Sequence, residues 1–532
     1  MRRISVKCIS FSGAANGNRI GHTMVISILI ASLMALAGAA ETDVRLAEAA
    51  MKRDTATVKT LIQQKVDVNA PGKDGTPALH WVVRVDDLES ARLLIQAGAD
   101  AKFADRYGVT PLFLACTNGN AAMIKLLLDA GADPNSVDPT GETALMTASK
   151  VGVLEAAKVL LDRGAKVDTA DPTYKQTALM AAVRENHPDI VQLLIDRGAN
   201  VNAKTRQGDT PGYILPNSVP GFGHGIGIVR GGLPERGSRY FIPGALTPLL
   251  YAARDGRLEA AKILVAAGAD LKTTDANSVT PLIMAISNNQ MAVARFLIEK
   301  GADINAGDWY GRTPLWTAVE VRNMDFDNGT FENLVDREPV LEMIKILLEK
   351  GANPNPRTKE SIPIRRFMLR TTGTLEWVDF TGQTPFLRAA YAGDLTVMRL
   401  LLEHGADPKI ATFGGTTPLM VAAGVDWVVD QTYDEGQKNL LEAVKLCYGL
   451  GLSVNDVNSM GITALMGAAN RGSDEIIQWL VDKGAKLDAK DAEGRTALNW
   501  AEGVFLATHP GKAKPSSMAL IQKLMASKTA AK

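Results

Sequence analysis

Residues 109–141 read VTPLFLACTNGNAAMIKLLLDAGADPNSVDPTG and contain the signals for two short helices followed by a tight hairpin. Thr110 is suited to cap a helix N-terminus, and the proline after it fits the first helical position, where the backbone N–H needs no partner. Asn-Gly-Asn at 118–120 breaks this helix, and a second apolar stripe at helical spacing covers 123–128. Gly131 supplies a left-handed residue that ends the second helix. The stretch therefore predicts a unit of helix, turn, helix and hairpin.

The same unit recurs along almost the whole chain. A threonine followed by Pro or Ala begins each segment, and most successive segments start 33 or 34 residues apart. A two-helix unit of this length cannot bury its apolar faces alone, so neighbouring units must stack into one continuous array. The threonines are Thr76, Thr110, Thr143, Thr177, Thr247, Thr280, Thr313, Thr384, Thr417, Thr463 and Thr496.

These repeats resemble the ankyrin repeat family, in particular exported multi-repeat proteins of the bacterial type. The resemblance covers residues 43–527 and implies an all-α solenoid that binds other macromolecules, usually proteins, and has no chemistry of its own. Two departures are the family's histidine, present only as His80, and Lys65, which replaces a hairpin glycine. The matches are the Thr-Pro-Leu start at Thr110, Thr280, Thr313 and Thr417, and the Gly-Ala-Asp/Asn hairpin entry at Gly98, Gly131, Gly198, Gly268, Gly301, Gly351 and Gly405.

The period divides the chain into about twelve units interrupted by insertions. The longest insertion is rich in Gly and Pro, which indicates a loop. The predicted segments are a leader at 1–40, an N-terminal capping repeat at 43–74, repeats at 75–211 and 247–494, a loop insertion at 212–246, shorter insertions near 322–338, 356–380 and 425–438, and a C-terminal capping repeat at 495–527.

Residues 24–40 (MVISILIASLMALAGAA) form the only long apolar stretch, with basic residues before it and an Ala-x-Ala pattern near its end. This order predicts a cleaved signal peptide and export to the periplasm or out of the cell. Three alternatives stay open. The stretch could remain as an N-terminal membrane anchor, Arg2-Arg3 could belong to a twin-arginine signal, or translation could start at Met24.

The insertions differ in charge according to their place in the repeat. Residues 212–246 and 356–380 belong to hairpins and each carry a net charge of +2, whereas 322–338 and 425–438 fall between paired helices and each carry −3. Hairpins and inter-helix turns lie at opposite ends of the helices, so the two signs separate onto opposite rims.

We therefore expect a basic, partly aromatic hairpin rim that contacts a protein partner, because arginine and aromatic residues are enriched at the energetic centres of interfaces. The alternative is that these segments are solvated loops whose charge imbalance is chance. The candidate contact residues are Arg230, Arg239, Tyr240, Phe241, Arg365, Arg366, Phe367, Arg370 and Trp377.

Motifs for catalysis and metal binding are missing from the sequence. No His-Glu-x-x-His, Cys-x-x-Cys, Gly-x-Ser-x-Gly or Walker motif occurs, and Cys116 and Cys447 occupy helix positions that suit small buried residues. The 58 basic residues balance the 58 acidic ones, which argues against a nucleic-acid partner. We expect no enzyme activity, cofactor or metal, and a monomer that is tethered to a membrane only if the leader is retained.

A different class of function remains as the alternative. The glycine-rich run at 221–232 could bind a small anion, or a catalytic site could be built from the 212–246 loop and neighbouring hairpins. That loop offers His224, Glu235 and three arginines as its titratable groups.

Overall fold

The computed structural model describes residues 43–207, 244–323, 337–359, 381–427, 435–504 and 511–530. Within these ranges it contains 24 α-helices and no β-strand, only isolated bridges such as the one between Val137 and Thr143. The all-α fold predicted from the repeat is confirmed. The predicted leader lies outside the described residues.

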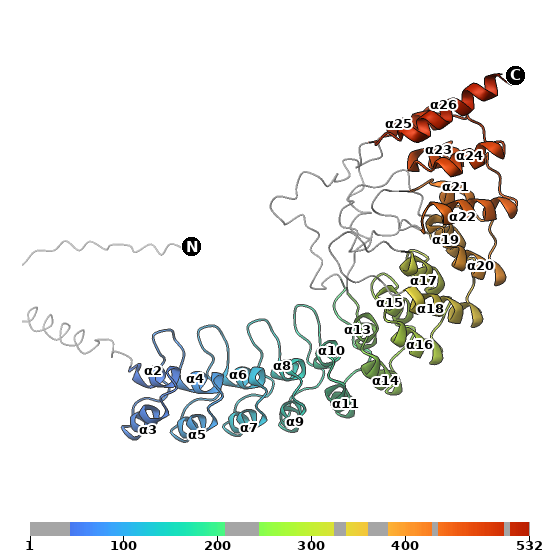
Figure 1. Ribbon diagram of the computed structural model, residues 1–532. Helices are drawn as coiled ribbons and strands as arrows, with labels where there is room; N and C mark the ends of the chain where they lie inside the picture. Colours follow the sequence, from blue (N-terminus) through green and yellow to red (C-terminus); the bar gives the residue numbers. More distant parts are fainter. Residues whose placement is uncertain are drawn as a thin grey trace, which may run out of the picture. The chain divides into compact units, whose positions relative to one another are not determined.

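In the described part of the chain the helices form twelve consecutive pairs, one for each repeat unit (Figure 1). The pairs are α2 (Arg45–Met51) with α3 (Thr55–Gln63), α4 (Ala78–Arg84) with α5 (Leu88–Gln96), α6 (Pro111–Asn118) with α7 (Ala121–Asp129), α8 (Ala144–Val151) with α9 (Leu154–Asp162), α10 (Ala178–Arg184) with α11 (Pro188–Asp196), α13 (Pro248–Asp255) with α14 (Leu258–Ala266), α15 (Pro281–Ser287) with α16 (Met291–Glu299), α17 (Pro314–Arg322) with α18 (Arg337–Glu349), α19 (Pro385–Ala392) with α20 (Leu395–Glu403), α21 (Pro418–Ala423) with α22 (Gln437–Gly449), α23 (Ala464–Arg471) with α24 (Asp474–Asp482), and α25 (Ala497–Gly503) with α26 (Pro515–Ala530).

Most of the threonines that begin the repeats cap the first helices, as their sequence context predicts, but Thr76 does not, because Pro77 is the N-cap residue of α4. The side-chain oxygens of Thr177, Thr280 and Thr384 accept a hydrogen bond from the backbone N–H three residues on, at 3.4, 3.3 and 3.2 Å. A cap of this kind stabilises a helix by about 1 kcal/mol. The repeated threonine therefore fixes where most of the repeat units begin.

The described residues group into two compact units. The first contains the described residues up to Ala115 together with Asp129–Ala132. In it α2 packs on α3 and α4, and α5 packs on the same two helices. The second unit contains Cys116–Leu128 and the described residues from Asp133 onward.

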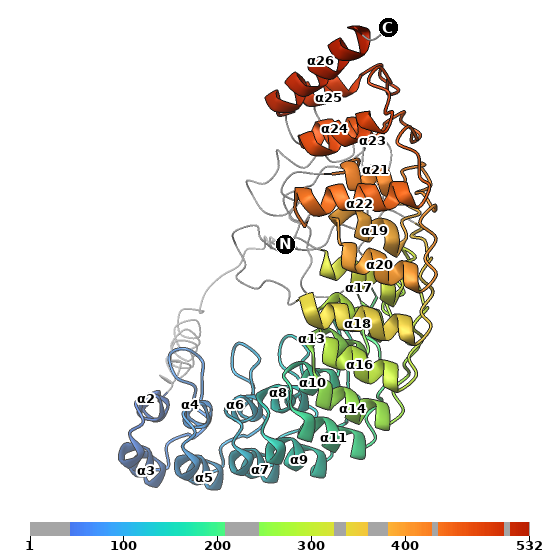
Figure 2. The same cartoon turned by 45° about the vertical axis from the view of Figure 1, so that its right-hand side comes forward.

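In the second unit the first helices of successive pairs form one row and the second helices form another (Figures 1 and 2). In the first row α8 packs on α10, α10 on α13, and so on to α25; in the second row α9 packs on α11, and so on to α26. Ala178, Ala182 and Ala252 are buried in the first row, where small side chains let neighbouring helices approach closely. Each pair thus buries its apolar faces against the pairs next to it.

Asparagine side chains join consecutive units at the hairpin bases. Asn135 Nδ2 donates to the carbonyl oxygen of Gly164 at 3.1 Å, with no insertion between the two residues. Asn202 makes the same bond to Gly268 at 3.3 Å, and Asn355 makes it to the glycine of the next unit at 3.0 Å, each across a long insertion. This hydrogen bond between neighbouring repeats is therefore the same with and without a hairpin insertion.

Hydrogen bonds at the bases of the hairpin insertions narrow their boundaries. The N–H of Thr358 donates to the carbonyl oxygen of Gln383 at 3.1 Å, and the N–H of Thr205 donates to that of Leu246 at 3.0 Å. Residues 244–246 and 356–359 therefore belong to the repeats and not to the insertions, because spacing alone places an insertion only to within a few residues. The extra residues of the two hairpins lie within 208–243 and 360–380.

Both cysteines of the described chain are structural. Cys116 and Cys447 are buried and free, and burial raises the pKa of the Cys447 thiol to about 12. Such thiols are protonated and unreactive at neutral pH. Within the described ranges, no helix has both the length and the apolar character needed to cross a bilayer.

Candidate partner-binding edge

The hairpins of the second unit are closed by the side chain of their first residue. Asp308 is buried, and its Oδ1 accepts hydrogen bonds from the backbone N–H groups of Tyr310 at 3.0 Å and Arg312 at 2.9 Å. Asp275 binds the N–H groups of Asn277 and Val279 in the same way, at 2.8 Å each. These bonds fix the backbone of each hairpin tip without a β-strand.

Burial makes these tip carboxyl groups weaker acids than usual. It raises the pKa of Asp275 to about 6, against the opposing hydrogen bonds from Val279 and Asn277, and the nearby Asp308 raises it further. Burial also raises the pKa of Asp308, although the Arg312 guanidinium opposes that change. Ionising these carboxyl groups therefore costs free energy in the folded protein.

Backbone hydrogen bonds link successive hairpin tips in the second unit. The N–H of Trp309 donates to the carbonyl oxygen of Asn277 at 3.0 Å, that of Lys359 donates to Tyr310 at 2.8 Å, and that of Phe413 donates to Thr381 at 3.0 Å. The tips are thus held side by side as a continuous surface. We use the name hairpin edge for residues 308–312, 357–359, 381–383 and 412–416.

Two large aromatic side chains are exposed on the hairpin edge. Trp309 is 54% exposed and Phe413 is 60% exposed, whereas the neighbouring Tyr310 is buried against Trp316. Arg357 lies over the Phe413 ring, with its guanidinium carbon 4.3 Å from the ring centroid. The edge therefore presents apolar rings next to a cation.

Arg357 is held in place by the backbone of two hairpins. Its Nη2 donates to the carbonyl oxygen of Ala411 at 2.7 Å, and its Nε donates to that of Gly382 at 3.3 Å. Lys359, two residues further on, is exposed at the point where the 360–380 insertion begins. Residues 360–380 contain three basic and three acidic residues, so the +2 counted over 356–380 comes from Arg357 and Lys359.

All of the contact residues predicted from the sequence lie outside the described residues, and so do His224 and Glu235 of the alternative ligand site. Their role remains a prediction. Sequence analysis missed Trp309 and Phe413. The sequence does contain a signal for them. Other hairpins carry Pro139 or Ser459 at the same position, so the fold does not require a large aromatic residue there. The predicted residues are Arg230, Arg239, Tyr240, Phe241, Arg365, Arg366, Phe367, Arg370 and Trp377.

A buried ion-pair network lies at the opposite ends of the helices, where the two inter-helix insertions leave the described chain. Asp394 is 2% exposed and accepts a hydrogen bond from Arg322 Nε at 2.9 Å. Arg337 Nη2 lies 3.6 Å from the same carboxylate oxygen and also pairs with Glu435. Arg322 and Arg337 flank one insertion and Glu435 follows the other, so the network brings the bases of both insertions together.

The ion-pair network changes the charge count of these insertions. The −3 of residues 322–338 includes Arg322 and Arg337, both of which pair with acidic residues of the network. The remaining 324–336 segment has four acidic residues and no basic one, and 428–434 has two acidic residues and no basic one. The charge difference from the hairpin edge thus persists when paired residues are left out.

Metal chemistry has no support in the described part of the chain, where no group of three or more His, Cys, Asp or Glu side chains could hold an ion. His187 Nε2 lies 3.1 Å from the carbonyl oxygen of Lys150, and His404 Nδ1 lies 2.9 Å from that of Leu400. Both histidines thus contact backbone carbonyl groups near helix C-termini.

Stacked helix pairs with linked hairpin tips define a solenoid-type repeat protein. The family model for ankyrin repeats in three copies matches residues 46–138, 130–205, 249–358 and 433–503, and the single ankyrin repeat model matches 381–413. These matches cover more than half of the chain, which belongs to the ankyrin repeat family.

Several curated proteins are similar to parts of this chain. A Caenorhabditis elegans homologue of transient receptor potential cation channel subfamily A member 1 is 27% identical over 194 residues, which cover 34% of this chain and 15% of that protein. Human ankyrin repeat domain-containing protein 63 is 28% identical over 185 residues, covering 34% and 40%. A putative ankyrin repeat protein of Rickettsia bellii is 38% identical over 73 residues, covering 13% and 6%. The chain thus spans less than half the length of these relatives.

Among solved structures, the ankyrin repeat domain of human ASB11 is similar to this chain. Its sequence identity is 26% and its TM-score is 0.38, over 48% of this chain and 98% of the domain.

Proposed function

We propose that this protein is an exported, non-catalytic scaffold that binds a partner protein through the hairpin edge and the insertions that leave it. Ankyrin repeats generally mediate protein–protein interaction. The observation that carries the proposal is that the hairpin edge exposes two rings, Trp309 and Phe413, and carries Arg357 over the Phe413 ring together with the exposed Lys359. Aromatic and arginine side chains of this kind supply most of the binding energy at protein interfaces.

The charge of the hairpin edge indicates the kind of partner. Arg357 and Lys359 favour a partner surface that is acidic and partly apolar. The arginines and aromatic residues predicted within 208–243 and 360–380 would extend this surface. Because salt screens charges, partner binding to this basic surface should weaken as the salt concentration rises.

The test is affinity capture with the full-length chain from the exported proteins of its source cells, analysed by mass spectrometry at low and high salt. We expect Trp309→Ala with Phe413→Ala to remove about nine-tenths or more of the captured partner, as loss of central aromatic residues does. Charge reversal of Arg365, Arg366 and Arg370 should also lower capture, and this loss should be larger at low salt than at high salt.

A matched control changes exposed residues away from the hairpins. Leu154→Ala with Lys158→Glu alters an exposed apolar and a basic side chain on α9 and should leave capture unchanged. Equal capture by the hairpin-edge variant and the wild type would contradict the proposal. N-terminal sequencing of the exported protein tests the leader separately, because a start near residue 41 is expected after cleavage and Met1 is expected for a retained anchor.

A further inference from the structure

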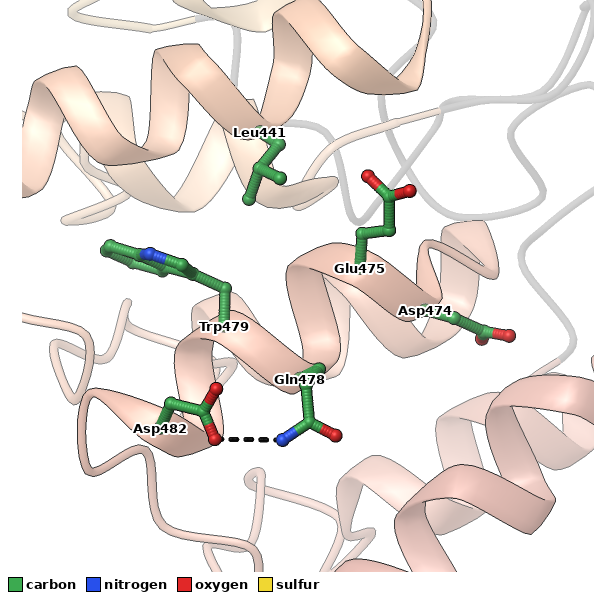
Figure 3. A pocket seen from close by; sticks show the side chains of 6 residues that line it. All are labelled: Leu441, Asp474, Glu475, Gln478, Trp479 and Asp482. Atoms are coloured by element: carbon green, nitrogen blue, oxygen red, sulfur yellow. Dashed lines mark hydrogen bonds between the residues drawn. The ribbon is translucent and has the colours of Figure 1, made fainter.

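An open groove with a volume of about 450 Å³ lies in the row of second helices, between α22 and α24. Figure 3 shows Leu441 projecting from α22, with Trp479 and Glu475 of α24 on the side that faces it. This groove is on different helices from those that carry the hairpin edge. It is lined by Leu441, Asp474, Glu475, Gln478, Trp479 and Asp482.

The groove has an aromatic floor made of two rings, Trp479 and Tyr448. Trp479 occupies a position filled by Val159 in α9 and Leu400 in α20. Tyr448 of α22 is 39% exposed and packs edge-on against Trp479, with 5.3 Å between ring centroids. Lys483 Nζ lies 5.8 Å from each ring centroid, so both rings lie within cation–π distance of a basic side chain.

In the part of the chain that the structure describes, the carboxylates of the groove form no ion pair with a basic side chain. In four sister helices a Glu pairs with a Lys three residues later, and α24 has Gln478 in place of that Lys. Within the described residues, no ion pair joins Glu475 to a basic side chain, and Asp482 accepts a hydrogen bond from Gln478 Nε2 at 2.8 Å. The sister pairs are Glu155–Lys158 at 3.9 Å, Glu259–Lys262 at 2.8 Å, Glu342–Lys345 at 3.8 Å and Glu442–Lys445 at 2.9 Å.

We propose that this groove binds an arginine-bearing segment of a partner protein. A guanidinium group can lie flat on the Trp479 ring and pair with the Glu475 carboxylate at the same time, which an ammonium group cannot do as well. An acidic segment would be repelled, and a purely apolar one would leave the carboxylates without partners.

The spacing of the two outer carboxylates sets the spacing of the arginines. Glu475 and Asp482 are seven residues apart on one face of α24, a distance of about 10 Å along the helix. In a polyproline II segment, residues three apart lie one turn and about 9 Å apart on the same side. The groove therefore fits Arg-x-x-Arg in that conformation, with one arginine at each carboxylate.

The test uses a short fluorescein-labelled peptide, Gly-Ser-Arg-Leu-Ser-Arg-Gly-Ser, and measures fluorescence anisotropy with the full-length protein. We expect saturable binding that weakens with salt. Trp479→Leu, which restores the sister residue, and Glu475→Gln with Asp482→Asn should each raise the dissociation constant about tenfold. The same peptide with citrulline at both arginine positions keeps the shape without the charge and should not bind.

A matched control separates the groove from general charge attraction. Glu155 and Asp162 occupy the same positions in α9, but they pair with Lys158 and Arg197 at 3.9 and 2.8 Å. Glu155→Gln with Asp162→Asn removes the same two charges and should change the dissociation constant less than twofold. Three results would each overturn the proposal: no binding of the arginine peptide, equal binding of the citrulline peptide, or an equal loss in the α9 control. The hairpin-edge variant Trp309→Ala with Phe413→Ala should bind the peptide normally, so the two proposals can fail separately.

Discussion

Asp275 shows how one residue serves both hairpin geometry and stability. Its carboxylate accepts two backbone hydrogen bonds at the hairpin tip, at 2.8 Å each, while burial raises its pKa to about 6. Asn458 occupies the same position in a later hairpin and accepts the same two bonds at 3.0 Å. The hydrogen bonds therefore do not need the charge.

We predict that Asp275→Asn removes a pH dependence of stability. A carboxyl group whose folded pKa is raised stabilises the folded state below its unfolded pKa, and that contribution is lost as the pH rises through about 6. Between about pH 4 and about pH 7, the free energy of unfolding of the wild type should fall by about 2 kcal/mol relative to that of the Asp275→Asn variant. Urea denaturation at both pH values measures the difference.

The reverse substitution provides the control for this prediction. Asn458→Asp places a carboxyl group in an equivalent buried tip and should add a pH dependence of the same sign. If Asp275→Asn and the wild type respond equally to pH, then ionisation of Asp275 does not contribute to folding stability.

At the scale of elements, the ion-pair network of Arg322, Arg337, Asp394 and Glu435 connects helices from successive repeats. Asp394 caps α20 by accepting a hydrogen bond from the N–H of Val397 at 3.2 Å, and it also receives Arg322 from the end of α17. Arg322 Nη1 donates to the carbonyl oxygen of Arg337 at 2.7 Å, at the start of α18. The network thus joins the end of α17 to the start of α18, the two points between which the insertion lies.

We predict that Asp394→Ala destabilises the second unit by about 3–5 kcal/mol, because it leaves Arg322 buried without an anion. Asp54 is the matched control, since it caps α3 through Thr57 N–H at 2.9 Å but has no arginine partner. Asp54→Ala should cost only about 1 kcal/mol. Urea denaturation of both variants tests this, and equal losses would show that Asp394 acts only as a cap.

At the scale of the second unit, the stack is continuous across its hairpin insertions. Thr358 pairs with Gln383, and Asn355 still binds the next unit, although 360–380 lies between them. These contacts between neighbouring pairs are made by residues outside 360–380.

We predict that replacing residues 360–380 by a short Gly-containing turn leaves the stability of the second unit within about 1 kcal/mol of the wild type, because closing a shorter loop costs less entropy. Partner capture should fall in the same variant if the arginines of this segment bind the partner. Thermal denaturation and the capture assay measure the two effects separately. A large loss of stability would mean that the insertion packs on the repeats.

Much of the fold could be predicted from the sequence because its signals are local. Thr280 and the proline after it define a helix start within a few residues, and the same start recurs with the period of the repeat. The hairpin edge could be predicted only in part. The rim that carries it follows from the repeat, but Phe413 could not be recognised as a neighbour of Arg357 from its position in the chain.

The sequence by itself determined the repeat unit, the order of the helices and the places where insertions interrupt them, since each depends on residues close together in the chain. Only the tertiary structure decided which distant residues meet, such as Arg322 with Asp394, 72 residues later. It also decided that Tyr448 of α22 packs against Trp479 of α24. The physical reason is that contacts between units depend on how one helix pair is set against the next, and side-chain packing fixes that register.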